Sequence, residues 1–517
     1  MTNRESSQPA DVTIVGGGHN ALVAATYLAR AGRDVLLLER LGHVGGAAVS
    51  ARAFPDHDAR LSRFSYLVSL MPQSLVDDLG LQLELRSRPT ASFTPYERDG
   101  IARGLLVETD EGEATRASFR ELTGSDEAFG AWQEFYAEVA ELAEAVAPTF
   151  LEPLPRRQDL GCVDLPIWTD VVERPLGEAI ERRFTDDVVR GVVGTDALIG
   201  TFASLHEDSL VQNRCFFYHL VGNGTGEWRV PVGGMGAVTA ELERVALDAG
   251  VRILTGADVV GIDPDTSGVT VQWRDATGHH ETRTDWVLSG VAPWVLDGLL
   301  PDASPTQAKP SGAQFKINLL VSRLPALRSG LDPHVAFAGT FHVNEDMSQL
   351  EELHAAATRG QAPFAAGELY CHTLTDRSIL GPELADSPAQ TLTYFGLHTP
   401  CENLTDTESG DRAYRQFLQA IDQHLAEPLE PLVLGVEHKT PSQVEAELNM
   451  PGGHIFHGDL AWPWLEDEEQ AATPAARWGV ATEHPRVLVC GSGARRGGAV
   501  SGIAGHNAAH ALLESFG

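Results

Sequence analysis

The stretch that most limits the fold of this chain lies near its amino terminus and reads "VTIVGGGHNALVAATYLARAGRDVLLLER". Its two apolar runs are typical of buried strands, and the segment between them has the composition of a helix. Three glycines stand at the first turn, where Gly16 permits a tight turn and Gly18 lets a phosphate approach the backbone. The expected bounds are residues 12–15 for the first strand, 21–31 for the helix and 35–38 for the second strand.

Two further residues complete this strand–helix–strand unit. Ala21 takes a position where only a small residue lets helix and strand pack closely, and Glu39 closes the second strand. The Glu39 carboxylate can accept hydrogen bonds from a ribose 2′-OH, and it would repel a 2′-phosphate. The alternative is a glycine-rich turn that binds nothing, but strand, turn, helix, strand and acid in this order favour a dinucleotide site. These residues alone leave both NAD and FAD open.

Length and composition indicate a soluble, multidomain protein. The 517 residues suffice for two or three domains, and 43% hydrophobic and 21% charged residues are usual for a globular protein. No apolar run approaches the length of a membrane span, and "MTNRESSQPAD" lacks the basic start and apolar core of a signal peptide. We therefore expect a cytoplasmic protein whose residues 1–9 form a disordered tail.

Charge and cysteine content exclude several classes of partner. The net charge of −34 argues against nucleic acid and against anionic membranes, because both need basic patches. The five cysteines never occur in C-x-x-C spacing, so they form neither a disulfide framework nor a redox pair nor a zinc pattern. His454 and His457 form a His-x-x-His pair near Asp459, but no further ligand cluster accompanies them, and we expect no metal.

Three later stretches extend the nucleotide-binding pattern. "ERLGHVGGAAVS" carries Gly45 and Gly46, which indicate a second close approach of the backbone, or else an ordinary loop. "WRVPVGGMGAVTAELERVALDAGVRILTGADVVGI" predicts a turn, a helix over residues 236–249, and strands over 251–254 and 259–262. "RVLVCGSGARRGGAVSGIAGHNAAHALL" predicts a strand, a glycine-rich loop, and a helix small-sided enough to lie against a cofactor.

Together these motifs resemble the superfamily of FAD-dependent amine oxidases and phytoene desaturases. Within it, "GGGHNALVAA", "RFSYLVSL", "FKINLLVSRLP" and "GGHIFHGDL" are most similar to the branch called pyridine nucleotide-disulfide oxidoreductase domain-containing protein. The resemblance covers nearly the whole chain in the right order and implies FAD, not NAD, as the cofactor. The expected fold is α/β, with a Rossmann-like FAD-binding domain (residues 10–90, 225–300 and 440–517) interleaved with a mixed α+β substrate domain (residues 91–224 and 301–439).

The resemblance also implies which residues hold FAD. Gly16 and Gly18 would cradle the pyrophosphate, Glu39 would bind the ribose, and N–H groups near Gly491 would face the flavin's N1 and O2. The sequence departs from the pattern at Arg496, where similar proteins often have proline, and we favour a surface loop there over a position beside the flavin. The other cofactor residues that it implies are His19, Asn20, Ala21, Arg40, Gly45, Gly46, Ala47, Val259, Gly498, Ala499 and Val500.

Three side chains are candidates for catalysis. Lys316 matches by pattern a strand lysine of flavin amine oxidases that reaches flavin N5 through a water, and burial would lower its pKa. The alternative is a strand-end lysine that reaches solvent. Tyr66 could face the substrate, although aromatic residues in apolar runs usually belong to the core. His457 could reach the flavin or the substrate.

The function expected from this resemblance is an FAD-dependent dehydrogenase or desaturase. It would transfer a hydride from a C–H of a small to medium organic substrate to flavin N5, with O₂ or a quinone as electron acceptor. The alternatives are an amine oxidase that releases H₂O₂, a flavin-dependent isomerase, and a non-catalytic FAD-binding partner protein. An amine substrate needs a cation-binding aromatic or acidic site, and the sequence reveals none. Membrane docking is not expected, and a homo-oligomer stays open.

Overall fold

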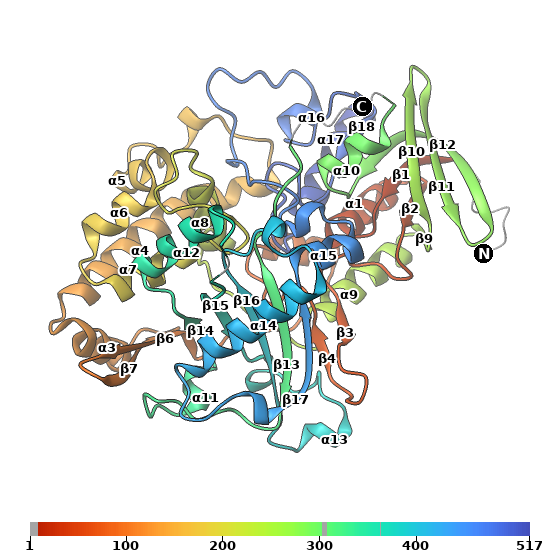
Figure 1. Ribbon diagram of the computed structural model, residues 1–517. Helices are drawn as coiled ribbons and strands as arrows, with labels where there is room; N and C mark the ends of the chain where they lie inside the picture. Colours follow the sequence, from red (N-terminus) through yellow and green to blue (C-terminus); the bar gives the residue numbers. More distant parts are fainter. Residues whose placement is uncertain (1–8, 302–307, 362, 517) are drawn as a thin grey trace.

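Two seven-stranded sheets form the framework of the protein (Figure 1). The computed structural model describes residues 9–301, 308–361 and 363–516. The predicted disordered tail, apart from Pro9, lies outside the described residues. Among the described residues, no helix is long and apolar enough to cross a membrane.

The first sheet has the strand order β10-β11-β12-β1-β2-β9, with β18 beside β12. Strands β1, β2, β9, β18 and the end of β12 run parallel, whereas β10, β11 and the start of β12 form an antiparallel meander. This arrangement confirms the predicted α/β fold class with a Rossmann-like domain. The strands are β1 (Ala10–Val15), β2 (Val35–Glu39), β9 (Arg252–Thr255), β10 (Asp258–Asp265), β11 (Gly268–Asp275), β12 (Gly278–Ser289) and β18 (Val487–Val489).

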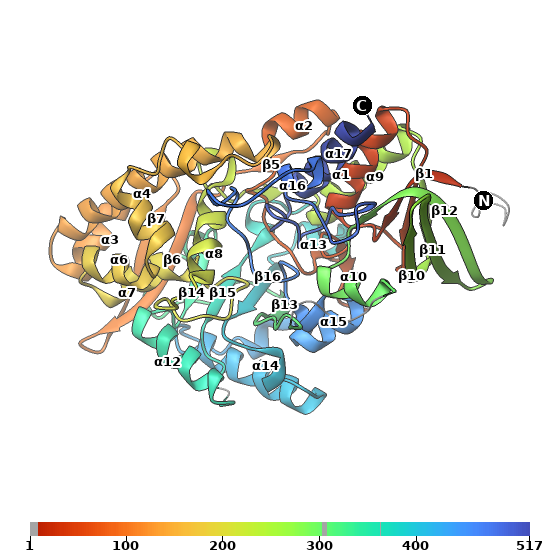
Figure 2. The same ribbon diagram turned by 90° about the horizontal axis from the view of Figure 1, so that it is seen from above.

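Both faces of this sheet are buried, as is usual for parallel strands. Val12 and Ile14 of β1 pack on one face against α1, α9 and α17, whereas Val15 packs on the other face with the meander and α10. Figure 2 shows α1, α9 and α17 gathered beside β1, next to both labelled ends of the chain. These helices are α1 (His19–Arg30), α9 (Met235–Asp248), α10 (Pro293–Leu299) and α17 (Ile503–Phe516).

Helices α1 and α17 touch backbone to backbone. A Cβ atom at Gly505 of α17 would lie 1.9 Å from the carbonyl oxygen of Asn20 in α1. The Asn20 amide also donates to the carbonyl of Gly497, at 3.5 Å, in the loop before α17. The contact therefore joins the two ends of the chain at the start of α1.

The second sheet has the order β17-β13-β16-β15-β14-β6-β7, and only its β14–β6 pair is parallel. One face carries an apolar core with Phe315, Ile317 and Phe341, which α14 (Thr407–Asp422) covers through Phe417. Lys316, which the family resemblance places on a strand, lies in β13. The strands are β6 (Thr90–Arg98), β7 (Ile101–Glu108), β13 (Phe315–Val321), β14 (Thr340–Val343), β15 (Gly367–Tyr370), β16 (Gln390–Gly396) and β17 (Val433–Lys439).

A group of helices, α3 to α7, lies at the end of the molecule opposite the first sheet (Figures 1 and 2). Helix α4 is followed by a 3-10 turn, Ala147–Leu151, and its aromatic residues Phe129, Trp132 and Phe135 pack into the core beside α7 and α8. These helices are α3 (Glu113–Thr123), α4 (Glu127–Val146), α5 (Pro166–Trp168), α6 (Leu176–Arg183), α7 (Asp187–Thr195) and α8 (Val211–Leu220).

Short elements connect these units. Two small sheets pair β3 with β4 and β5 with β8. The remaining strands and helices are β3 (Ser50–Arg52), β4 (Arg60–Ser62), β5 (Leu85–Arg86), β8 (Val230–Pro231), α2 (Gln73–Leu79), α11 (Pro333–Ala336), α12 (Met347–Thr358), α13 (Pro382–Ala385), α15 (Pro441–Leu448) and α16 (Pro474–Arg477).

The close contact at Gly505 predicts that one added methyl group at this position destabilises the protein. We expect Gly505→Ala to lower the free energy of unfolding by about 1–3 kcal/mol, because the new methyl would overlap the Asn20 carbonyl. Gly130→Ala is the matched control, because Gly130 lies in α4 with open space around its Cα; this change should stabilise by about 0.5–1 kcal/mol. Urea denaturation of both variants checks this, and equal effects of the two changes would contradict it.

Candidate cofactor and substrate cavity

One cavity of about 650 Å³ is lined by residues of both sheets. Pockets of this size suit cofactors and small ligands. Every residue that the sequence predicted for cofactor binding or catalysis lies on its wall, although their roles stay predictions. These residues are Gly16, Gly18, His19, Asn20, Ala21, Glu39, Arg40, Gly45, Gly46, Ala47, Val259, Gly491, Gly498, Ala499 and Val500, together with Tyr66, Lys316 and His457.

The turn between β1 and α1 forms one end of the cavity. Gly16 has a φ of +89°, which favours glycine, and its N–H donates to the Leu38 carbonyl at 2.8 Å. A Cβ atom at Gly18 would meet nothing within 4 Å, so the backbone there faces open space. Helix α1 begins after Gly18 without a side-chain cap and without an acid in its first turn. Its first N–H groups are therefore available to a negatively charged ligand.

The Glu39 carboxylate is fixed by backbone donors. Its Oε2 accepts from Gly17 N at 2.6 Å, and its Oε1 accepts from Leu41 N at 2.7 Å. Each carboxylate oxygen has a second lone pair, so Glu39 can still accept hydrogen bonds from hydroxyl groups in the cavity. Gly45 packs against the same turn, where its N–H donates to Gly17 O at 2.7 Å. The second glycine pair thus approaches the first turn closely.

The loop before α17 lines the cavity beside the start of α1. His19 Nε2 lies 3.1 Å from the Ala499 carbonyl, and burial lowers the pKa of His19 to about 4. Burial, with His454 and His19 nearby, also lowers the pKa of His457 to about 4. Both imidazoles are therefore neutral near pH 7. The His454 Nδ1 accepts from the N–H groups of Phe456 and Gly458, at 3.3 Å each, which orients the His-x-x-His turn.

The expectation that Arg496 is a surface loop residue is wrong. Arg496 is buried, and its guanidinium donates to the carbonyls of Thr149 at 2.7 Å, Glu152 at 2.8 Å and Trp478 at 3.2 Å. These carbonyls lie far away in the sequence, so the local composition of the loop could not reveal them. Through these hydrogen bonds Arg496 holds the loop before α17 against the segments that contain these three carbonyls.

A row of side chains crosses the second sheet on the side of the cavity. In the strand register Lys316 lies opposite Phe395, Phe395 opposite Glu368, and Glu368 opposite His342. Residues directly opposite each other in a sheet project from the same face, and all four line the cavity. The His342 Nδ1 is 2.7 Å from the Thr94 hydroxyl oxygen on β6, which extends the row.

Lys316 is enclosed and does not reach solvent. Its side chain is buried between β16 and β17, its ammonium nitrogen has no hydrogen-bond partner among the described residues, and it lies 3.7 Å from the centroid of the Phe395 ring. Burial holds the pKa of Lys316 well below its usual value, against a small opposing effect of Glu437. The alternative of a solvent-exposed lysine is thereby wrong.

An acidic group that the sequence analysis missed lies on the same wall. Glu368 accepts from the Thr195 hydroxyl at 3.2 Å and from the Tyr370 hydroxyl. Burial raises the pKa of Glu368 to about 7, and burial together with Glu368 raises that of Asp196 to about 8. Arg88 also lines the cavity and donates to the Thr340 hydroxyl at 3.4 Å.

A signal for part of this group was present in the sequence. "TFHV" and "GELY" place His342 and Glu368 at alternate positions among apolar residues, as expected where one face of a strand is polar.

Tyr66 lies near this group. The centroid of its ring is 5.0 Å from that of the Tyr370 ring, and burial raises the pKa of Tyr66. Tyr66 is thus a neutral phenol that is buried and yet lines the cavity.

Comparison with known proteins agrees with this fold. Residues 14–76 match the family model described as NAD(P)-binding Rossmann-like domain. The chain is 47% identical to Uncharacterized protein Rv0897c of Mycobacterium tuberculosis, covering 97% of each chain. It is 28% identical to Pyridine nucleotide-disulfide oxidoreductase domain-containing protein 2 of Rattus norvegicus, covering 98% of this chain and 94% of the relative.

Solved structures share the same overall fold. A putrescine oxidase variant from a redesign of cofactor binding matches with a TM-score of 0.61 and 17% identity, covering 98% of this chain and 99% of that one. At this identity the likeness extends to the fold alone.

Because Lys316 is buried, replacing it with an apolar residue should raise the free energy of unfolding by an amount that depends on pH. In the window between its lowered folded pKa and its unfolded value of about 10.4, the unfolded state binds more protons, so stability rises with pH. We expect Lys316→Met to stabilise the protein, most at pH values below the folded pKa, with the gain shrinking toward pH 10.4.

Denaturant titrations from pH 6 to 10 check this prediction. Lys439→Met is the matched control, because Lys439 lies opposite Lys316 on β17 but pairs with Glu447 at 2.6 Å, and it should not stabilise. A pH-independent difference between Lys316→Met and the wild type would refute the prediction.

Proposed function

We propose that this chain is an FAD-dependent oxidoreductase. It belongs to the same family as the Mycobacterium tuberculosis protein Rv0897c and carries a Rossmann-like domain. One observation supports this above the others. A single cavity joins an uncapped helix start, which suits a diphosphate, to a buried wall of aromatic and ionisable side chains. The name of the rat relative, an oxidoreductase domain-containing protein, points the same way.

The residues at the phosphate turn fit FAD. Gly18 leaves open space where a pyrophosphate would approach, the first N–H groups of α1 would donate to it, and Glu39 would accept from the ribose hydroxyls. In the loop before α17, the backbone around Gly491 and Gly498 would lie against the flavin. The resemblance of the glycine motifs to FAD enzymes favours FAD over NAD.

The other end of the cavity suits a small to medium organic substrate. When bound, FAD supplies a hydride acceptor for a C–H next to nitrogen, oxygen or a double bond. The chain's own part is to position that carbon and exclude water, for which Trp132, Tyr136 and Phe395 provide apolar walls. Lys316, whose pKa burial lowers and whose nitrogen has no partner among the described residues, would hold a water or move a proton there. O₂ or a quinone would serve as the electron acceptor.

Amine oxidation is the second candidate reaction. Asp196 and Glu368 line the cavity together with Tyr66 and Tyr370, which gives the acidic and aromatic wall that an ammonium group requires. Release of H₂O₂ on aerobic addition of primary amines would favour this reaction, whereas bleaching of the flavin bands only by non-amine substrates would favour a dehydrogenase.

The proposed cofactor site predicts the effect of one side chain at Gly18. We expect Gly18→Val to weaken FAD binding by about 10- to 100-fold, because its side chain would project into the open space where the pyrophosphate would lie. The FAD-free protein should lose only about 0.5–1 kcal/mol of stability, since valine is a poorer N-cap than glycine but the Gly18 backbone is extended at φ −67° and ψ 168°.

Absorption spectra and FAD titrations of the purified protein check this prediction. Gly42→Val is the matched control, because Gly42 is exposed, also has open space around it, and does not line the cavity. A wild-type protein that is colourless and cannot be reconstituted with FAD would remove the oxidoreductase proposal. Equal FAD affinity of Gly18→Val and Gly42→Val would refute the proposal that the turn between β1 and α1 binds the pyrophosphate of FAD.

The role proposed for Lys316 predicts a kinetic defect. We expect Lys316→Met to slow either the reduction or the reoxidation of the flavin by about 10²- to 10⁴-fold, the usual loss when a proton-handling group is removed. Stopped-flow absorbance with and without oxygen separates the two steps, with Lys439→Met as the control. Unchanged rates for both steps would show that Lys316 has no catalytic role.

A further inference from the structure

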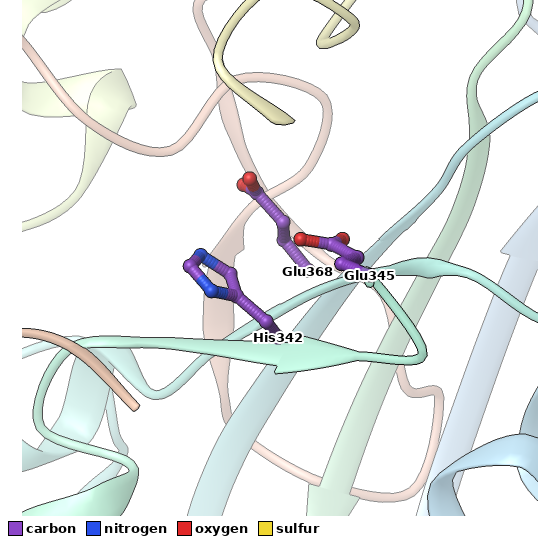
Figure 3. A group of neighbouring side chains, drawn as sticks. All are labelled: His342, Glu345 and Glu368. Atoms are coloured by element: carbon purple, nitrogen blue, oxygen red, sulfur yellow. The ribbon is translucent and has the colours of Figure 1, made fainter. Parts of the chain in front are cut away.

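Three buried side chains meet beside the second sheet, where β14 ends. His342 on β14 lies opposite Glu368 on β15, so both project from one face. Asn344 then adopts a φ of +54°, and the chain turns so that Glu345 comes to the same side. One ligand atom from each of His342, Glu345 and Glu368 lies within 4.8 Å of the others. Figure 3 shows the three side chains gathered on one side of the strand that carries His342.

Glu345 provides the second observation. Its side chain is 1% exposed, and neither carboxylate oxygen has a hydrogen-bond partner among the described residues. A buried carboxylate without a partner is costly, and buried charges in proteins are normally paired or bound to a metal. Helix α7 keeps Glu345 in place, because a Cβ atom at Gly191 would lie 1.7 Å from the Glu345 carbonyl oxygen.

His342 is oriented as a ligand would be. Its Nδ1 is hydrogen-bonded to the Thr94 hydroxyl, and no hydrogen bond to its Nε2 occurs among the described residues. Metal-binding histidines commonly use their second ring nitrogen in this way, because the bond fixes the orientation of the ring. No ion pair joins His342 to Glu345 or Glu368 in the described part of the chain, so a gap remains between the three groups.

Carboxyl groups predominate around the gap. Glu368 and Asp196 both line the adjoining cavity, and Glu345 lies beside Glu368. A bound metal ion requires deprotonated carboxyl ligands, so its binding would release any protons that these groups hold.

We propose that His342, Glu345 and Glu368 bind one divalent transition-metal ion. Two carboxylate oxygens and one imidazole nitrogen suit zinc or manganese, with ligand distances of about 2.0–2.2 Å for zinc. His342 and Glu368 line the cavity and Glu345 does not, so the ion lies in the cavity wall with its remaining positions open to the cavity. An oxygen-donor group of a bound small molecule would complete its coordination. The site differs from the His454 and His457 pair considered in the sequence, and it does not depend on FAD.

Metal titrations of the purified full-length protein test this proposal. The protein is freed of metal with a chelator, its flavin content is recorded, and Zn²⁺ and Mn²⁺ are titrated by calorimetry with Mg²⁺ as a comparison. We expect one tightly bound Zn²⁺ or Mn²⁺ per chain. Glu345→Gln should weaken this binding by at least about 100-fold, and Thr94→Val by about 10-fold through the lost orientation of His342.

Controls separate a lost ligand from a lost fold. Glu352→Gln makes the same chemical change at an exposed residue of α12 and should bind like the wild type. If Glu345→Gln does not fold, anomalous diffraction from crystals of the wild type soaked in Mn²⁺ still decides the question, with a peak expected between the three side chains. Failure of the wild type to bind an ion, an anomalous peak elsewhere alone, or equal affinity of Glu345→Gln and the wild type would overturn the proposal.

Discussion

The backbone contact between α1 and α17 is the constraint on which the cofactor end of the cavity depends. The two helices come from opposite ends of the chain, and Gly505 lets them approach until a Cβ atom would overlap the Asn20 carbonyl. At this distance the His19 ring reaches the Ala499 carbonyl. The loop before α17 is also held from behind by Arg496, which bonds three carbonyls. The position of this loop relative to the glycine turn is therefore set by packing of the protein itself.

The second sheet divides stability and chemistry between its two faces. On one face, Phe315, Phe341 and their neighbours pack against α14 in a continuous apolar core. Burial of this apolar surface stabilises the folded protein. The other face holds Lys316, Glu368 and His342 in an enclosed wall, where polar groups are costly unless they are paired. On this face the Lys316 nitrogen has no hydrogen-bond partner among the described residues, whereas Glu368 and His342 are each hydrogen-bonded to a neighbour. A buried polar group without a protein partner can be satisfied by a ligand.

The parts of the fold that depend on local patterns could be predicted from the sequence. The helix after the glycine turn begins two residues before its predicted start, and the strand predicted at residues 35–38 is β2, which ends one residue later. These predictions succeed because hydrophobic periodicity and turn glycines act over short distances. The metal-ligating group could not be predicted, since His342 and Glu368 meet through strand register, and Glu345 joins them only because Asn344 turns the chain. The role of Arg496 depends on carbonyls from two distant segments, so its loop looked exposed in the sequence.

The order of segments in the first sheet has a consequence for biosynthesis. The strand beside β12 is β18, at Val487–Val489, and the loop before α17 follows it. A ribosome makes the glycine turn long before these pieces. The nucleotide-binding unit therefore stays without one strand and one wall until β18 and the following loop have been made, although domains generally fold from the amino terminus during synthesis. During that interval the growing chain has to keep an unfinished sheet edge from pairing with other chains.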